Sequence, residues 1–358
     1  MFAKKNQPGF MLMMTFFGLA LLVTLVTYYL HTTRIYTRFG YVFYEREKVK
    51  MLARSGITIA LSQLSLADSK LIKDLQKNDQ ESLKNQKDPV WRKKQLCKIL
   101  LTVCNRWQTF ECTEKDDGIE GTIQIAITAE DGKIPLSKLI NYEKHDFEIF
   151  DQIKKTGGKE ILKDFFDRYK KYANGKDLFE SFEQWLKKTD YYLVDVTQLL
   201  IIESFKDIRN TLFFIPPAVD QKEQSLSAAF TDCVSIERSA GALNPFLFSE
   251  SVKQVYGFDK GKKFFSSEQI DEIIEKVSLD SIKWDTVWDT YCKDVYGKNF
   301  QGLPEGFSQM LSTKFEPNVF SVVCYAKVGK IEQKLVAIIV RNFSQNSEVF
   351  EIKKLYWL

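Results

Sequence analysis

Few residues in this chain have the types and spacing that catalysis requires. A serine or cysteine nucleophile needs a histidine within reach, and the sequence has only two, His31 and His145. His31 follows a long apolar stretch, and His145 stands alone in a polar segment, where a histidine is usually a solvated surface residue. No phosphate-binding P-loop, GxGxxG after a strand or HExxH motif occurs. The sequence therefore predicts a protein that is not an enzyme.

Candidate metal ligands are also sparse. Asp116, Asp117 and Glu120 could form a weak calcium site, but Asp-Asp-Gly is more typical of a turn. The six cysteines include no CxxC pair, and with so few histidines a structural zinc site is not expected. If the domain lies outside the cytoplasm, Cys104 and Cys112 are the nearest disulfide candidates; free buried thiols are the alternative, which we slightly favour. We expect no cofactor.

The dominant stretch of the sequence runs from Phe10 to Leu30. These 21 residues include no charge, proline or amide side chain. As a helix they would be roughly 31 Å long, enough to cross the hydrocarbon core of a bilayer. Backbone groups in lipid must be satisfied within the segment, which requires a helix. Tyr28, Tyr29 and His31 stand where an interfacial aromatic belt is expected, so we predict a transmembrane helix over residues 10–30.

The helix is expected to continue amphipathically over residues 31–66. Small and apolar residues repeat there at intervals of three and four, which is the pattern of one apolar helix face. They are Val49, Leu52, Ala53, Gly56, Ile57, Ala60, Leu61 and Leu64. This face would pack on a globular head, although any signal anchor followed by an amphipathic helix gives the same pattern.

The remaining chain divides into three segments. Residues 67–140 form the first part of the head and include a half-buried strand with Ile123, Ile125 and Ile127, followed by a turn at 130–133. Residues 141–280 are helix-rich, with apolar side chains on one face of helices near 161–172 and 178–188. Residues 281–358 contain the C-terminal strands, including a hairpin over 318–343. The predicted fold is α+β: a long N-terminal helix on an antiparallel sheet, with a large helix-rich insertion.

Residues 1–9, MFAKKNQPG, form a short basic leader that ends in Gly9. No small-x-small site follows the span, so cleavage behind it is not indicated. A basic leader ending in Gly, followed by Phe and a spanning helix, resembles the processing site of type IV prepilins and pseudopilins. The resemblance implies that a prepilin peptidase cleaves between Gly9 and Phe10 and methylates Phe10.

Met14 stands at the fifth mature position, where that family has a glutamate thought to neutralise the N-terminal amine of a neighbouring subunit. A lone charge in lipid is costly, and a subunit at the filament tip has no such neighbour. The minor pseudopilin K of type II secretion systems is a large tip subunit that typically lacks this glutamate, and the chain resembles it. The resemblance assigns Met14 and Gly18 to assembly.

Loose matches to the K family continue through the head. Family positions are matched by Leu52, Ala53, Gly56 and Ala60, by Gly132 and Lys133, and by Asn244, Pro245, Phe246, Ser249, Val255 and Gly257. Ser249 is expected to cap a helix at its start and Gly257 at its end. Only Trp185 and Asp190 match the family's calcium-binding segment, and the intervening Lys187 and Lys188 make calcium doubtful here.

The resemblance implies a minor pseudopilin at the tip of a type II secretion pseudopilus, or of a related type IV pilus-like one, that initiates assembly and caps the filament. Implied partners are other minor pseudopilins, the major pseudopilin, the inner-membrane assembly platform, prepilin peptidase and membrane lipid; a net charge of +4 gives no indication of nucleic acid. The protein would cross the inner membrane once, with its C-terminal domain in the periplasm, although Arg34 and Arg38 after the span count against that orientation. The alternative is a single-span anchored extracytoplasmic binding protein unrelated to pili.

Overall fold

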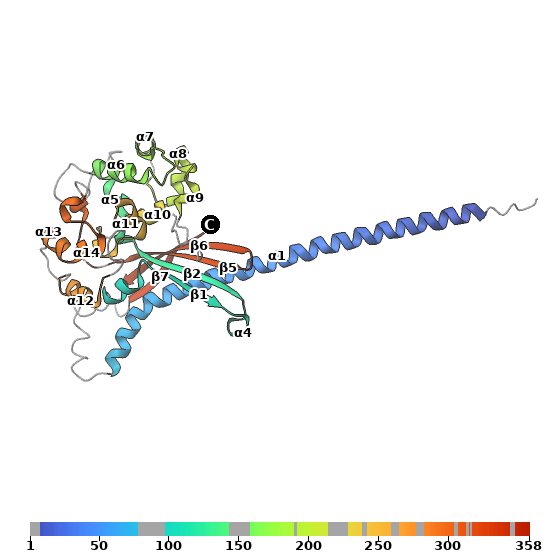
Figure 1. Cartoon of the computed structure of the whole chain (residues 1–358), viewed down its shortest axis with the longest axis horizontal. Coiled ribbons are helices and arrows are strands. Elements are labelled where there is room, and N and C mark those ends of the chain that lie inside the picture. The colour runs from blue at the N-terminus through green and yellow to red at the C-terminus, as the bar shows by residue number, and fades with distance from the viewer. Residues whose placement is uncertain are drawn as a thin grey trace, which may run out of the picture.

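The computed structural model describes residues 8–77, 97–142, 158–189, 192–213, 228–237, 242–258, 265–276, 283–303, 307–312, 315, 317–343 and 348–358. Its longest element is helix α1, Pro8–Lys77, which has 70 residues. At 1.5 Å per residue, α1 is about 105 Å long. Figure 1 shows its N-terminal half projecting far from the head and its C-terminal half lying along the sheet. The predicted continuation of the spanning helix into the head is confirmed, and the helix extends beyond residue 66.

The head is built on a five-stranded antiparallel sheet with the order β1-β2-β5-β6-β7. Its strands are β1 Trp107–Cys112, β2 Gly121–Ala129, β5 Val319–Val328, β6 Ile331–Phe343 and β7 Glu348–Trp357. The predicted C-terminal hairpin is β5 and β6, and Gly329 has a φ of +55° in the turn that joins them. A short parallel pair, β3 Ile134–Pro135 and β4 Val234–Ser235, lies apart from this sheet.

The C-terminal half of α1 packs on one face of the sheet. The predicted apolar stripe is buried there, from Val49 to Leu64, apart from a partly buried Leu61. Contact is closest at Gly56, where an added Cβ would lie 2.3 Å from Cys324 Sγ and 2.8 Å from Ile123 Cγ2. The α+β architecture, with the long helix on an antiparallel sheet, is therefore as predicted.

Helices cover the opposite face of the sheet. Side chains that alternate with the α1-facing ones on β5, such as Ser321 and Val323, line a cavity together with Val196 of the helical layer. The longer helices of this layer and its flank are α6 Gly158–Tyr169, α7 Leu178–Lys188, α11 Glu250–Tyr256 and α12 Ser267–Lys276. The shorter helices are η2 Val196–Ile201, α8 Glu203–Lys206, α9 Arg209–Leu212 and α10 Phe230–Cys233.

Helices extend further along the chain than the helix-rich segment expected over 141–280. They include α13 Trp284–Val287, a π-helix over Trp288–Cys292, α14 Lys293–Tyr296 and α15 Phe307–Met310. Residues 97–103 are also helical, and the remaining short helices are α4 Glu114–Asp117, α5 Leu136–Leu139, η1 Glu130–Gly132, η3 Pro245–Leu247 and η5 Phe300–Gly302. The C-terminal strands thus begin at Val319, well after residue 281.

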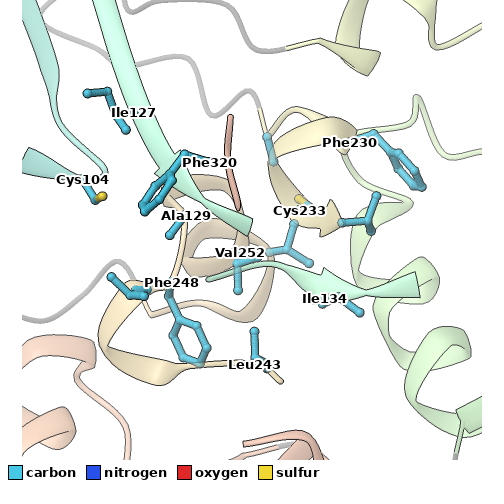
Figure 2. Close-up of a cluster of buried hydrophobic side chains, with 14 of the residues drawn as sticks. Cys104, Ile127, Ala129, Ile134, Phe230, Cys233, Leu243, Phe248, Val252 and Phe320 are labelled. Carbon is cyan, nitrogen blue, oxygen red and sulfur yellow. The ribbon is translucent and has the colours of Figure 1, made fainter. Parts of the chain in front are cut away.

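A shared hydrophobic core joins the sheet to the helices. Figure 2 shows Ala129 at the end of β2 beside Phe320 of β5, with Cys233 of α10 and Val252 of α11 in the same cluster. All four side chains are almost completely buried. The head therefore packs its sheet and its helical layer around common side chains.

Both predicted caps of helix α11 are confirmed. The Ser249 hydroxyl accepts a hydrogen bond from the Val252 backbone N–H at 3.1 Å and donates to the carbonyl oxygen of Asp232. Gly257 ends the helix with a φ of +69°, in the left-handed region that glycine adopts most readily. Asn244 similarly accepts from the Phe246 N–H before η3.

Candidate functional site

The candidate site is the exposed half of α1, from Phe10 to Tyr44. Within the described ranges, α1 is the one helix long and apolar enough to cross a membrane, and none of its most apolar window is buried. Large apolar side chains project from it in all directions, and Phe16, Leu22 and Tyr29 are each more than 60% exposed. An apolar helix with this exposure fits a membrane-anchored protein.

The threonine hydroxyls within the predicted span are satisfied by the helix itself. The hydroxyls of Thr15, Thr24 and Thr27 each donate to a backbone carbonyl oxygen three or four residues earlier, at 2.8 Å. A hydroxyl bonded in this way presents no unpaired donor to lipid. The local chemistry of the segment is therefore compatible with a hydrocarbon surrounding, which periodicity alone did not reveal.

The residues predicted for processing and assembly all lie on this exposed half. Gly9 and Phe10 lie in the first turn of α1, and the Phe10 side chain is 60% exposed. Met14 and Gly18 lie one turn apart on the same helix face, and Met14 is 59% exposed. A Cβ added at Gly9 or Gly18 would meet no atom within 4 Å. None of the four residues contacts the head, and their roles stay predictions.

The head contains a buried ion pair within residues 130–133, a segment for which the sequence predicted only a turn. Lys133 Nζ lies 2.5 Å from Glu130 Oε1, and both side chains are at least 96% buried. The ammonium also donates to the carbonyl oxygen of Thr231 at 3.0 Å and to Ser321 Oγ at 2.7 Å. Its three protons thus have three acceptors, from elements far apart in the chain.

This ion pair borders a cavity of about 50 Å³ between the sheet and the helical layer. Val323, Val336 and Ile338 line its sheet side, and Val196 and Phe213 line its helical side. The volume suits a few water molecules rather than a metabolite. Among the described residues no group of three metal-ligating side chains comes together. The arrangement ties the helical layer to the sheet through Lys133.

The cysteines are unsuited to nucleophilic chemistry. All six are free thiols in the structure, which agrees with the alternative favoured from the sequence; five are buried and Cys112 is partly buried. Burial raises the pKa of Cys104 and of Cys324 to about 12. Burial and the Asp117 carboxylate raise the pKa of Cys112. Because the thiolate is the reactive form, the five buried thiols are protonated and shielded near neutral pH, and Cys112 is the most accessible of the six.

Two predicted residues, His145 and Asp190, lie outside the described residues, as do residues 1–7 of the leader. Asp116 and Asp117 lie on the short helix α4, which Thr113 caps by accepting from the Asp116 N–H. The Asp116 carboxylate accepts a hydrogen bond from the Thr113 hydroxyl, and the Asp117 carboxylate accepts one from the Thr113 backbone N–H. They therefore serve the turn that the sequence favoured.

No protein-family model and no curated protein matches the chain. Among solved structures, the chain is similar to a chain in the crystal structure of the GspK–GspI–GspJ complex from the type 2 secretion system of enterotoxigenic Escherichia coli. The alignment has a TM-score of 0.40 and 13% sequence identity, and it covers 87% of this chain and 96% of that chain. What the geometry itself establishes is an α+β head held on a single long helix whose exposed half fits a membrane anchor.

Proposed function

We propose that the chain is a minor pseudopilin at the tip of a type II secretion pseudopilus, or of a related pilus-like filament, and is most like subunit K. The observation that carries the proposal is the division of α1 into two halves. The first half is exposed and free of acids up to Tyr44 and is apolar over residues 10–30, and the second half is buried on the sheet through the Val49–Leu64 stripe. One unbroken helix thus serves the membrane at one end and the core at the other.

The protein would act by assembly, without catalysing a reaction. The exposed half of α1 would lie beside the corresponding helices of the other minor pseudopilins and the major pseudopilin. With Met14 in place of an acid, the span has no carboxylate that could pair with the N-terminal amine of a neighbouring subunit. This suits a tip subunit, which has no subunit above it. The helical layer over the far face of the sheet gives the head the bulk to cap a filament and initiate its growth.

The proposal includes processing and location. Prepilin peptidase would cleave between Gly9 and Phe10 and methylate Phe10, and the assembly platform would insert the product into the filament. The head would then lie in the periplasm, with the span in the inner membrane. An anchored binding protein unrelated to pili would have the same span but would keep its leader.

The test is recovery of partners from native membranes. The tagged full chain is cross-linked in its own host, isolated, and its partners are identified by mass spectrometry. We expect other pseudopilins with the wild-type chain and with Gly40→Ala, since a Cβ at Gly40 meets no atom within 4 Å. Gly9→Leu should block processing and lose these partners. Recovery of an unprocessed wild-type chain without any pseudopilin would contradict the proposal and favour the anchored binding protein.

A further inference from the structure

The exposed half of α1 is longer than a membrane requires. From Phe10 to Tyr44 it measures roughly 52 Å, whereas the hydrocarbon core of a bilayer is about 30 Å thick and the whole bilayer about 40–45 Å. Residues 31–44, here called the stalk, begin where the predicted span ends and precede the first contacts with the sheet. If the span fills the core, the first turns of the stalk lie at the level of the lipid headgroups.

The stalk carries positive charge and no negative charge. Arg34 and Arg38 are exposed and lie one turn apart on the same helix face, with His31 one turn earlier. No acid occurs between Phe10 and Tyr44, and the first one, Glu45, lies 3.7 Å from Lys48 Nζ. Among the described residues, neither arginine therefore has a carboxylate partner.

The face of the stalk opposite the arginines is aromatic. Tyr36, Phe39 and Phe43 are 71%, 70% and 67% exposed, and their spacing of three and four residues places them on one stripe. Arginine has a long flexible side chain, so a guanidinium on the first turns after the span can reach back to the headgroup phosphates. The guanidinium fork matches phosphate oxygens in geometry as well as in charge.

We propose that the stalk binds anionic phospholipid headgroups through Arg34 and Arg38. Charge complementarity and continuity with the membrane span favour lipid over an acidic protein as the occupant. The proposal rests on membrane insertion of residues 10–30 and not on the pseudopilin role. It applies to whichever side of the membrane the head occupies.

The test uses the full-length protein in phosphatidylcholine bilayers that contain spin-labelled phosphatidylglycerol or spin-labelled phosphatidylcholine. Electron spin resonance measures the fraction of each label immobilised at the protein surface. A basic residue near an anionic surface contributes about 1 kcal/mol, so each arginine should favour phosphatidylglycerol by about fivefold. The preference should fall at high salt, because exposed charges are screened beyond the Debye length.

The variant Arg34→Gln/Arg38→Gln should lose the preference. Its matched control is Lys163→Gln/Lys170→Gln, which removes the same charge from exposed positions on the head. An unchanged preference in the arginine variant, or no preference in the wild type, would overturn the proposal. So would an arginine variant that keeps its lipid preference but loses cross-linked protein partners, since the arginines would then serve a protein interface. All three proteins should unfold at the same urea concentration, because the substituted side chains are exposed.

Discussion

The seating of α1 on the sheet depends on the absence of a side chain at Gly56. A Cβ at this position would lie 2.3 Å from Cys324 Sγ, 2.8 Å from Ile123 Cγ2 and 3.2 Å from Ile125 Cγ2. Real carbon contacts are far longer, so Gly56→Ala must lift the helix or move side chains from two strands. Overpacking a core of this kind costs up to about 3 kcal/mol. The better helix propensity of alanine returns about 1 kcal/mol, which leaves a net loss near 2 kcal/mol.

The assay is urea unfolding of the full chain in detergent, followed by the fluorescence of head tryptophans such as Trp107 and Trp288. Gly40→Ala is the control, because it makes the same chemical change on α1 where a Cβ meets nothing within 4 Å. Adding Cys324→Ala to Gly56→Ala should recover part of the loss, since it removes the nearest obstructing atom. If Gly56→Ala were as stable as Gly40→Ala, the close approach of helix and sheet would be refuted.

Three further predictions concern the head. Ser249→Ala should lower the free energy of unfolding by about 1–2 kcal/mol, because it removes both a helix cap and a buried hydrogen bond. Thr113→Ala removes the exposed cap of α4 and should cost less, which a comparison of the urea midpoints of the two variants checks. Lys133→Met should lower the free energy of unfolding by about 3–5 kcal/mol, because it leaves the Glu130 carboxylate buried and unpaired. Adding Glu130→Met should restore much of that stability in the same assay, and a double variant less stable than the single one would contradict the reasoning. Because burial raises the pKa of the core thiols, the folded state keeps protons that the unfolded state loses, so the free energy of unfolding should fall as pH rises above about 8.5. In the native protein at pH 8, iodoacetamide should label Cys112 first, as measured by mass spectrometry. Equal labelling of all six thiols would contradict the burial of the other five.

Local patterns were sufficient to predict the elements that depend on local physics. The three- and four-residue spacing around Leu52 and Ala60 identified the buried face of α1, because a straight helix repeats its contacts at that interval. Ser249 and Gly257 marked both ends of α11, since cap chemistry acts within one turn. The β5–β6 hairpin followed from two β-rich runs around Gly329.

Features that join distant segments could not be predicted in this way. Thr128 of β2 pairs with Ser321 of β5, and no local spacing indicates which strands become neighbours. The Lys133 ammonium is bonded to Thr231 and Ser321 for the same long-range reason. The helices around Trp288 were missed because their segment was assigned to the C-terminal strands. For the candidate site, the sequence located the span, and the structure added the exposed stalk and the internally satisfied threonines.

The most direct test of the central claim is the intact mass of the chain, with N-terminal peptide mapping, after extraction from its own membrane. If the chain is a pilin-like subunit, its first residue should be Phe10 and its mass should include one added methyl group. A chain that still begins at Met1 in cells with an active prepilin peptidase would contradict the claim.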